Sequence, residues 1–119
     1  GTATRLAGKS GASQGSCTFT GDPSTVSYDN AYTPGAAAAS NGTAYFAIEL
    51  DGGVMNRACV IRIASSAATG IAGQNGTGTT GDNGPAVAAF LSQPGALATS
   101  PTGDLFVADG NLIRRVVTP

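Results

Sequence analysis

The sequence contains no histidine and no tryptophan, and only 11% of its residues are charged. Histidine is the commonest general base in enzymes and the commonest metal ligand, so its absence removes both roles. Ser-His-Asp and Cys-His nucleophilic arrangements are excluded for the same reason, as is a zinc site built on histidine ligands. We therefore expect no catalytic residue and no enzyme. The acidic residues form no calcium-loop pattern, so we also expect no metal site and no cofactor; a calcium site built on carboxylates is the alternative.

Charge and hydrophobicity exclude two further classes of partner. The formal net charge is −1 with only 6 Lys and Arg residues, so no basic surface is available to bind a nucleic acid. The chain has no run of about 18 apolar residues, so we expect no membrane insertion. What it does have is small residues, because 18 glycines accompany many Ala, Ser and Thr residues. This composition favours an all-β fold of short strands joined by tight turns.

An internal repeat organises the chain. Five short motifs occur twice in the same order, at offsets of 53–65 residues. They are TRLAG at 4–8 and TGIAG at 69–73, GD at 21 and 81, PGA at 34 and 94, Gly42 and Gly103, and VIRI at 60–63 and IRRV at 113–116. We divide the chain into domains at residues 1–65 and 66–119. The first copy of the repeat is longer by an insertion over 49–58, and its last strand, at 69–72, lies past this division.

The two copies predict similar strands. The predicted ranges are 36–40, 44–50, 59–64 and 69–72 in the first copy, and 96–100, 104–108 and 112–117 in the second. Asn41-Gly42 predicts a type I′ hairpin turn, because both residues tolerate positive φ. Thr102-Gly103 is its counterpart in the second copy.

The second copy resembles one NHL repeat, the blade-forming unit of a family of β-propellers. The resemblance rests on GDNGPA at 81–86, DLFVADG at 104–110 and IRRV at 113–116. Ser100 departs from the family's usual Asp, and the first copy is more degenerate. The resemblance implies two four-stranded antiparallel propeller-type blades. It also implies a binding platform or an assembly module.

The second copy is one strand short, since it has three predicted strands and the first has four. Residues 2–7 are the candidate for the missing strand, because their TRLAG motif resembles the TGIAG of the first copy's fourth strand. Main-chain pairing would join this segment to the last strand of a neighbouring copy. The residues of this assembly strand pair are Thr2, Thr4, Leu6 and Ala7 on one side and Leu112, Ile113 and Val116 on the other.

Two blades cannot close a propeller, which needs roughly four to eight. Three ways of completing the unit remain open: further repeats of the same polypeptide, a ring of identical subunits, or head-to-tail strand exchange into a filament. The spacing favours a join between copies. Ile63 and Ile71 are 8 steps apart, and Val116 would be 9 steps from Leu6 if the two ends of the sequence were joined.

Both cysteines lie in the first copy, which suggests that Cys17 and Cys59 are bonded to each other. Such a disulfide implies an oxidising compartment. The alternative is two free, buried thiols in a cytosolic protein. Asn41 and Asn75 each begin an Asn-Gly-Thr glycosylation sequon on a predicted turn. Together these features favour a secreted or cell-surface glycoprotein.

The remaining polar residues are expected to be structural. Four acids lie in or beside turns, where their carboxylates would accept hydrogen bonds from backbone N–H groups: Asp22, Asp82, Asp104 and Asp109. Asp82 or Asn83 would also cap a helical turn over residues 85–91. The arginines Arg62, Arg114 and Arg115 either face a ligand or, as we favour, are exposed and alternate with the core residues Ile61, Ile63, Ile113 and Val116.

Two functions of different class follow. The first is a non-enzymatic extracellular structural unit that assembles with copies of itself, blade to blade, into a filament or a ring. The alternative is a carbohydrate- or protein-binding, lectin-like propeller fragment. Tyr28 and Tyr32 would be the contact residues for that ligand, whereas we place Tyr45 in the core.

Overall fold

The computed structural model describes residues 1–7, 17, 20–25, 31–50 and 57–117, and this part of the chain is all-β. It forms two antiparallel sheets, with no α-helix in these ranges. The first sheet has the spatial order β1 (Thr20–Gly21), β5 (Ala67–Gln74), β4 (Arg57–Ala64), β3 (Ala44–Leu50) and β2 (Ala31–Ala38). The second has the order β6 (Pro94–Thr99), β7 (Leu105–Asp109) and β8 (Leu112–Val116). Two 3₁₀ turns, η1 (Pro23–Thr25) and η2 (Ala86–Ala88), complete the described elements.

All seven predicted strands are present, with bounds shifted by a few residues at most of their ends. The first sheet has five strands where four were predicted, because β1 pairs with the outer side of β5. The second has three, as predicted for its part of the chain. The proposed division between residues 65 and 66 falls in the turn between β4 and β5, so the sheets themselves divide after Gln74.

The hairpin turns of the two copies have the same geometry. In the first, Gly42 N–H donates to the Ala39 carbonyl at 3.1 Å and Ala39 N–H donates to the Thr43 carbonyl at 2.8 Å. In the second, the equivalent bonds join Gly103 to Ser100 at 3.0 Å and Ser100 to Asp104 at 2.9 Å. The glycines alone have positive φ, 85° and 92°, so the predicted type I′ turn at Asn41-Gly42 is wrong. Each is a three-residue loop closed by a left-handed glycine.

The strand register is also equivalent in the two sheets. Ala44 lies opposite Ile63 in β3 and β4, and Leu105 lies opposite Val116 in β7 and β8. These pairs match at the offsets of 61 and 53 that the sequence motifs gave. Each residue of β3 or β4 can therefore be compared with one residue of β7 or β8.

The main core lies between the two sheets. Successive side chains of a strand point to opposite faces, so each sheet has an inter-sheet face and an outer face. The inter-sheet core contains the buried residues Tyr45, Ala58, Val60 and Ala72 of the first sheet and Leu91, Leu105, Val107 and Val116 near or in the second. A separate apolar cluster on the first sheet's outer face contains Cys17, Ile48, Cys59, Ile61 and Ala68.

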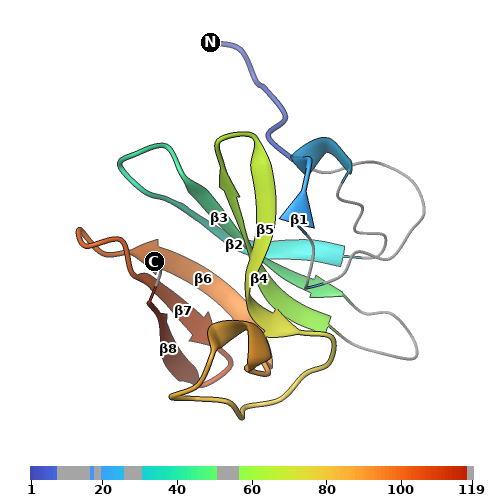
Figure 1. The fold of residues 1–119 in the computed structure, drawn as a ribbon, viewed down its shortest axis with the longest axis vertical. Coiled ribbons are helices and arrows are strands. Elements are labelled where there is room, and N and C mark those ends of the chain that lie inside the picture. The colour runs from blue at the N-terminus through green and yellow to red at the C-terminus, as the bar shows by residue number, and fades with distance from the viewer. Residues whose placement is uncertain (8–16, 18–19, 26–30, 51–56, 118–119) are drawn as a thin grey trace.

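The sheets meet along β2 and β6, which lie side by side in Figure 1. Here the repeated Pro-Gly-Ala motifs approach each other: a Cβ on Gly35 would lie 2.1 Å from the Gly95 carbonyl oxygen. Only a residue without a side chain permits this contact. At the ends of the same strands, the Thr99 hydroxyl donates to the Ala38 carbonyl at 3.2 Å.

Residues 1–7 form no sheet pairing within the described chain, and the N-terminal end of this segment extends away from the body (Figure 1). The predicted helical turn exists as η2, but Pro85 occupies its N-cap position and no side chain caps it. The predicted cap by Asp82 or Asn83 is therefore wrong. Among the described residues, no helix is long and apolar enough to cross a membrane.

Candidate assembly surface

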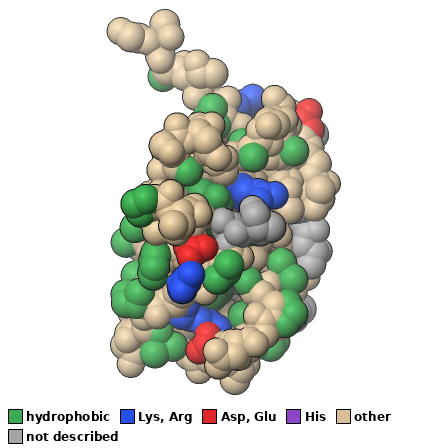
Figure 2. All heavy atoms as spheres, turned by 60° about the vertical axis from the view of Figure 1, so that its left-hand side comes forward, with side chains coloured by type: hydrophobic (Ala, Val, Ile, Leu, Met, Phe, Trp, Pro, Cys, Tyr) green, Lys and Arg blue, Asp and Glu red, His purple; other side chains and the backbone are tan. Residues whose placement is uncertain are grey.

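The described residues leave the outer face of the second sheet exposed. We call this the second outer face; it carries Phe106, Ile113, Arg115 and Val117. Phe106 is 38% exposed, Ile113 75% and Val117 67%. Figure 2 shows hydrophobic side chains gathered on the side of the molecule that carries this sheet, with charged groups between them. The prediction that Ile113 is a core residue is wrong, because β8 turns Arg114 and Val116 toward the interior instead.

The equivalent residues of the first sheet are buried. At the offsets of 61 and 53, Phe106 corresponds to Tyr45, which is 5% exposed, and Ile113 corresponds to Val60, which is 0% exposed. Tyr45 and Val60 pack against the second sheet in the inter-sheet core. Phe106 and Ile113 are thus at least as apolar as Tyr45 and Val60. Tyr45 and Val60 are buried, whereas the described residues leave Phe106 and Ile113 exposed.

The first sheet's outer face is only partly covered. We call it the first outer face; it carries Ala36, Phe46, Ile48, Ile61 and Ile63. Ile48 and Ile61 are buried beside the disulfide, whereas Phe46 and Ile63 are half-buried and Ala36 is exposed. A hollow of about 700 Å³ opens at this end, lined by Leu6, Ala7 and residues of β2, β3 and β4. Of the described residues in its lining, Arg5 is the one that is charged.

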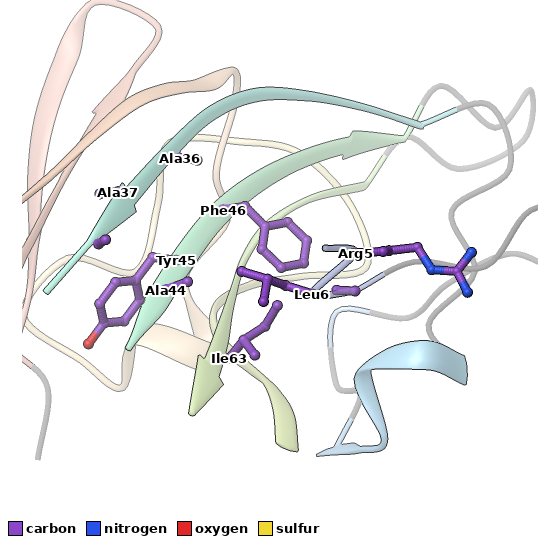
Figure 3. A pocket seen from close by; sticks show the side chains of 10 residues that line it. Arg5, Leu6, Ala36, Ala37, Ala44, Tyr45, Phe46 and Ile63 are labelled. Atoms are coloured by element: carbon purple, nitrogen blue, oxygen red, sulfur yellow. The ribbon is translucent and has the colours of Figure 1, made fainter. Parts of the chain in front are cut away.

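Leu6 lies over this hollow. Figure 3 shows its side chain between those of Phe46 and Ile63, while Arg5 and Tyr45 point away. Leu6 is nevertheless 65% exposed, so the N-terminal segment covers the apolar surface loosely. Thr2, Thr4 and Ala7 belong to the same unpaired segment, and their predicted partners Leu112, Ile113 and Val116 all lie in β8.

The outer edge of β8 is free among the described residues, because β8 pairs only with β7. The corresponding strand of the first sheet, β4, has β5 on that side. Within the described residues, the N-terminal segment and the outer edge of β8 are thus both unpaired, and they do not pair with each other. Edges of this kind are templates for strand addition.

The predicted disulfide is present. Cys17 and Cys59 are bonded, with their Cα atoms 5.7 Å apart, and both are buried. The bond attaches the segment before β1 to the first outer face. The backbone N–H of Cys17 also donates to the Asn75 side chain at 3.3 Å.

Arg114 is the feature that the sequence interpretation missed. It is 8% exposed rather than exposed as predicted, and its guanidinium binds Asp109 at 3.2 Å and Asp82 at 2.7 Å. It also donates to the carbonyls of Phe90 and Thr80. The signal was available, since GDNGPA and DLFVADG each supply an acid in a chain of few charges. Arg114 thereby fastens the segment before β6 to β8.

The other acids differ in their partners. Asp109 accepts hydrogen bonds from the backbone N–H groups of Ser92 and Gln93, both at 2.8 Å, which confirms its predicted role. Asp82 and Asp104 bind arginines instead, so their predicted backbone partners are wrong. Asp104 pairs with Arg115 on the solvent side of β8.

Asp22 has its predicted backbone partner. Its carboxylate accepts from the backbone N–H and the hydroxyl of Ser24, each at 2.8 Å. The backbone N–H first and the hydroxyl second hold the pKa of Asp22 below its ordinary value. The group is fully exposed, and these two bonds order the turn at Asp22–Ser24.

The remaining predicted positions fall as follows. Asn41 and Asn75 are both exposed, and the Asn41 side chain accepts from Thr43 N–H at 3.0 Å. Tyr45 is in the core, as predicted. Tyr28 and the side chain of Tyr32 lie outside the described residues. Within the described ranges, no three His, Cys, Asp or Glu side chains gather to hold a metal ion.

Comparisons of the chain with models of known protein families, with curated proteins and with solved structures found no match. The likeness to NHL repeats therefore stays a prediction from the motifs.

Proposed function

We propose that the chain is a non-enzymatic structural unit that assembles with copies of itself by strand complementation, blade to blade, into a filament or a ring. In this proposal the two sheets act as NHL-like blades. Residues 1–7 of one copy pair with the free edge of β8 in the next, supplying the strand that the second blade lacks.

The free β8 edge is the observation that carries this proposal. β8 spans Leu112–Val116 and, among the described residues, has no strand paired along its outer side, whereas β4 has β5 paired there. Backbone hydrogen bonds would give such a contact its strength, and alternate side chains would give it register. The repeat in sequence supplies the incoming strand, because TRLAG at 4–8 resembles TGIAG at 69–73 in β5.

The N-terminal segment is available for this pairing. Residues 1–7 make no strand pairing in the described chain, so moving them breaks no sheet. Leu6 would take the place that Ile71 takes beside β4, where Ile71 packs against the inter-sheet core. Its burial there would gain part of the roughly 2 kcal/mol that a fully buried leucine side chain contributes.

The proposed location is extracellular. The Cys17–Cys59 disulfide supports it, because such bonds persist mainly in oxidising compartments. The two sequon asparagines are exposed and sit on turns, where a glycan meets no packed core. Removal of N-linked glycans from protein of the native source should lower its mass; an unchanged mass would overturn the glycoprotein part of the proposal.

The assembly is tested by sedimentation of the full chain beside a chain lacking residues 1–7. We expect the full chain to form species larger than one subunit and the shortened chain to remain a monomer with an unchanged circular dichroism spectrum. A synthetic peptide of residues 1–7 should bind the shortened chain at β8. Leu6→Asp should weaken peptide binding, and Gly1→Asp, at the position equivalent to the exposed Ser66 before β5, is the matched control. A full chain that stays monomeric at high concentration would refute the proposal.

A further inference from the structure

The chain carries both halves of a contact that it already makes once. Inside the chain, the face of the first sheet with Tyr45 and Val60 packs against the face of the second sheet with Leu105 and Val116. The residues equivalent to Tyr45 and Val60 are Phe106 and Ile113, on the second outer face. The residues equivalent to Leu105 and Val116 are Ala44 and Ile63, at the hollow on the first outer face.

Both outer faces are accessible, and they lie on opposite sides of the two packed sheets. The second outer face presents protruding apolar side chains, led by Ile113 at 75% exposure and Phe106 at 38%. The first outer face presents a hollow of about 700 Å³ lined largely by alanine, Phe46 and Ile63. A heterologous contact joins two different surfaces of identical subunits. Here one surface protrudes and the other is concave, and their residues are equivalent to those of the inter-sheet contact.

From this we propose that the second outer face of one copy docks into the hollow on the first outer face of another, repeating the inter-sheet contact between chains. This inference rests on the proposed assembly and names the surface that it uses. The occupant is a second copy of this chain, because the faces of one chain already fit each other in the same register.

The charges agree with this partner. Arg115 on the second outer face is paired with Asp104. None of the residues named on that face therefore brings an unpaired charge to the contact. Among the described residues that line the hollow, Arg5 is the one that is charged, and its side chain points away from Phe46 and Ile63 (Figure 3). Apolar docking here therefore requires no burial of an isolated charge.

Leu6 covers part of the hollow into which the other copy would dock. In the isolated chain it occupies the space between Phe46 and Ile63 that the docking residues of another copy would fill (Figure 3). When residues 1–7 pair with β8 of that copy, Leu6 leaves the hollow. Strand exchange and face docking thus involve the same two copies, and each removes an obstacle to the other.

The test uses two variants of the full chain that each damage one face. Phe106→Asp alters the second outer face without touching the β8 edge, and Ala36→Asp alters the hollow at an exposed alanine. Each variant alone should self-associate about tenfold or more weakly than the unaltered chain, because a charge would be desolvated at the contact. Mixed together, they should form a 1:1 dimer, because each retains the face that the other has lost.

Two controls keep the test decisive. Ala88→Asp adds the same charge at an exposed residue of η2, outside both faces, and should not change self-association. Ala98→Asp, at an exposed residue of β6 that lies opposite Phe106 on the same face, is the second variant if Phe106→Asp unfolds. Melting curves of every variant identify loss of fold.

The outcomes separate this inference from the strand proposal. If the face variants assemble as well as the unaltered chain while deletion of residues 1–7 abolishes assembly, face docking is wrong and strand complementation stands. If the face variants do not assemble and the 1–7 peptide fails to bind β8, face docking stands and strand complementation is wrong. If each face variant alone is monomeric but their mixture forms no dimer, the contact is not head-to-tail and the inference fails.

Discussion

The two sheets fill equivalent positions with opposite chemistry. In the first sheet Ile48 and Ile61 form a buried apolar pair beside the disulfide. At the offsets of 61 and 53 the second sheet has Asp109 and Arg114, a buried ion pair. In both sheets these positions lie beside the bond that fastens the preceding segment: Cys17 to Cys59 in the first, and residues 80–93 to Arg114 and Asp109 in the second. The two sheets thus share the same strand register, although one has an apolar pair at these positions and the other has an ion pair.

The largest effect is expected from removing the disulfide. Cys17→Ala with Cys59→Ala opens a loop with a sequence separation of 42 residues. In the chain-entropy model this lowers the free energy of unfolding by about 4 kcal/mol. Urea unfolding checks the size of the effect. If the comparison holds, NMR signals of β7 and β8 stay unchanged at low urea, whereas a loss of those signals would show that the sheets do not have separate fastenings.

A somewhat smaller effect is expected from Arg114→Ile, which copies the first sheet's residue into the second. It leaves Asp109 buried without its cation, and breaking such a pair costs about 3 kcal/mol or more. Adding Asp109→Ile restores the apolar pair of the first sheet. We expect the double variant to be less destabilised than the sum of the two single variants, by about 1 kcal/mol or more. Strict additivity in urea unfolding would break the equivalence of the two pairs.

Gly35 and Gly95 are equivalent in sequence but should differ in tolerance. A Cβ on Gly35 would lie 2.1 Å from the Gly95 carbonyl oxygen, whereas on Gly95 the nearest atom would be 3.8 Å away. Gly35→Ala should therefore lower the free energy of unfolding by about 2 kcal/mol through overpacking, and Gly95→Ala should have little effect. Thermal unfolding of the pair measures this. Equal losses would show that the two sheets do not meet at this point.

The two hairpin glycines should behave alike. Gly42 and Gly103 both have positive φ, so Gly42→Ala and Gly103→Ala should each cost about 1 kcal/mol, as expected for alanine in the left-handed region. Their difference, measured by chemical unfolding, should be smaller than either loss. A large difference would mean that the shared hydrogen-bond pattern conceals different local packing.

The smallest effect concerns Asp22 and pH. Its pKa is lowered by Ser24, so the bonds to Ser24 are present above the ordinary carboxyl pKa and are lost as the pH falls through the lower, folded value. NMR titration should show the amide of Ser24 shifting at a pH below that of a free aspartate. Asp22→Asn should abolish the titration and leave the second sheet unaffected. A titration at the ordinary pH would contradict the bond.

Much of the fold could be predicted from the sequence because turns and strands are local. Gly42 and Gly103 mark hairpins through their backbone requirement, and the alternation of residues in 44–50 gives β3 its bounds correctly. β1 was missed because two residues carry no periodicity. The burial of Arg114 was missed because an alternating pattern does not say which face a neighbouring loop will cover. Ile113 is exposed for the same reason, because it lies on the opposite face of β8 from Arg114.

The close approach of Gly35 and Gly95 also bears on curvature. The angle between the two sheets is set where β2 and β6 touch backbone to backbone, with no side chain to act as a spacer. If the contact between copies repeats this angle, each added copy turns the assembly by a constant amount. A side chain on Gly35 would then widen that angle. The shape of the assembly, closed or helical, would depend on a residue that lies outside every surface between copies.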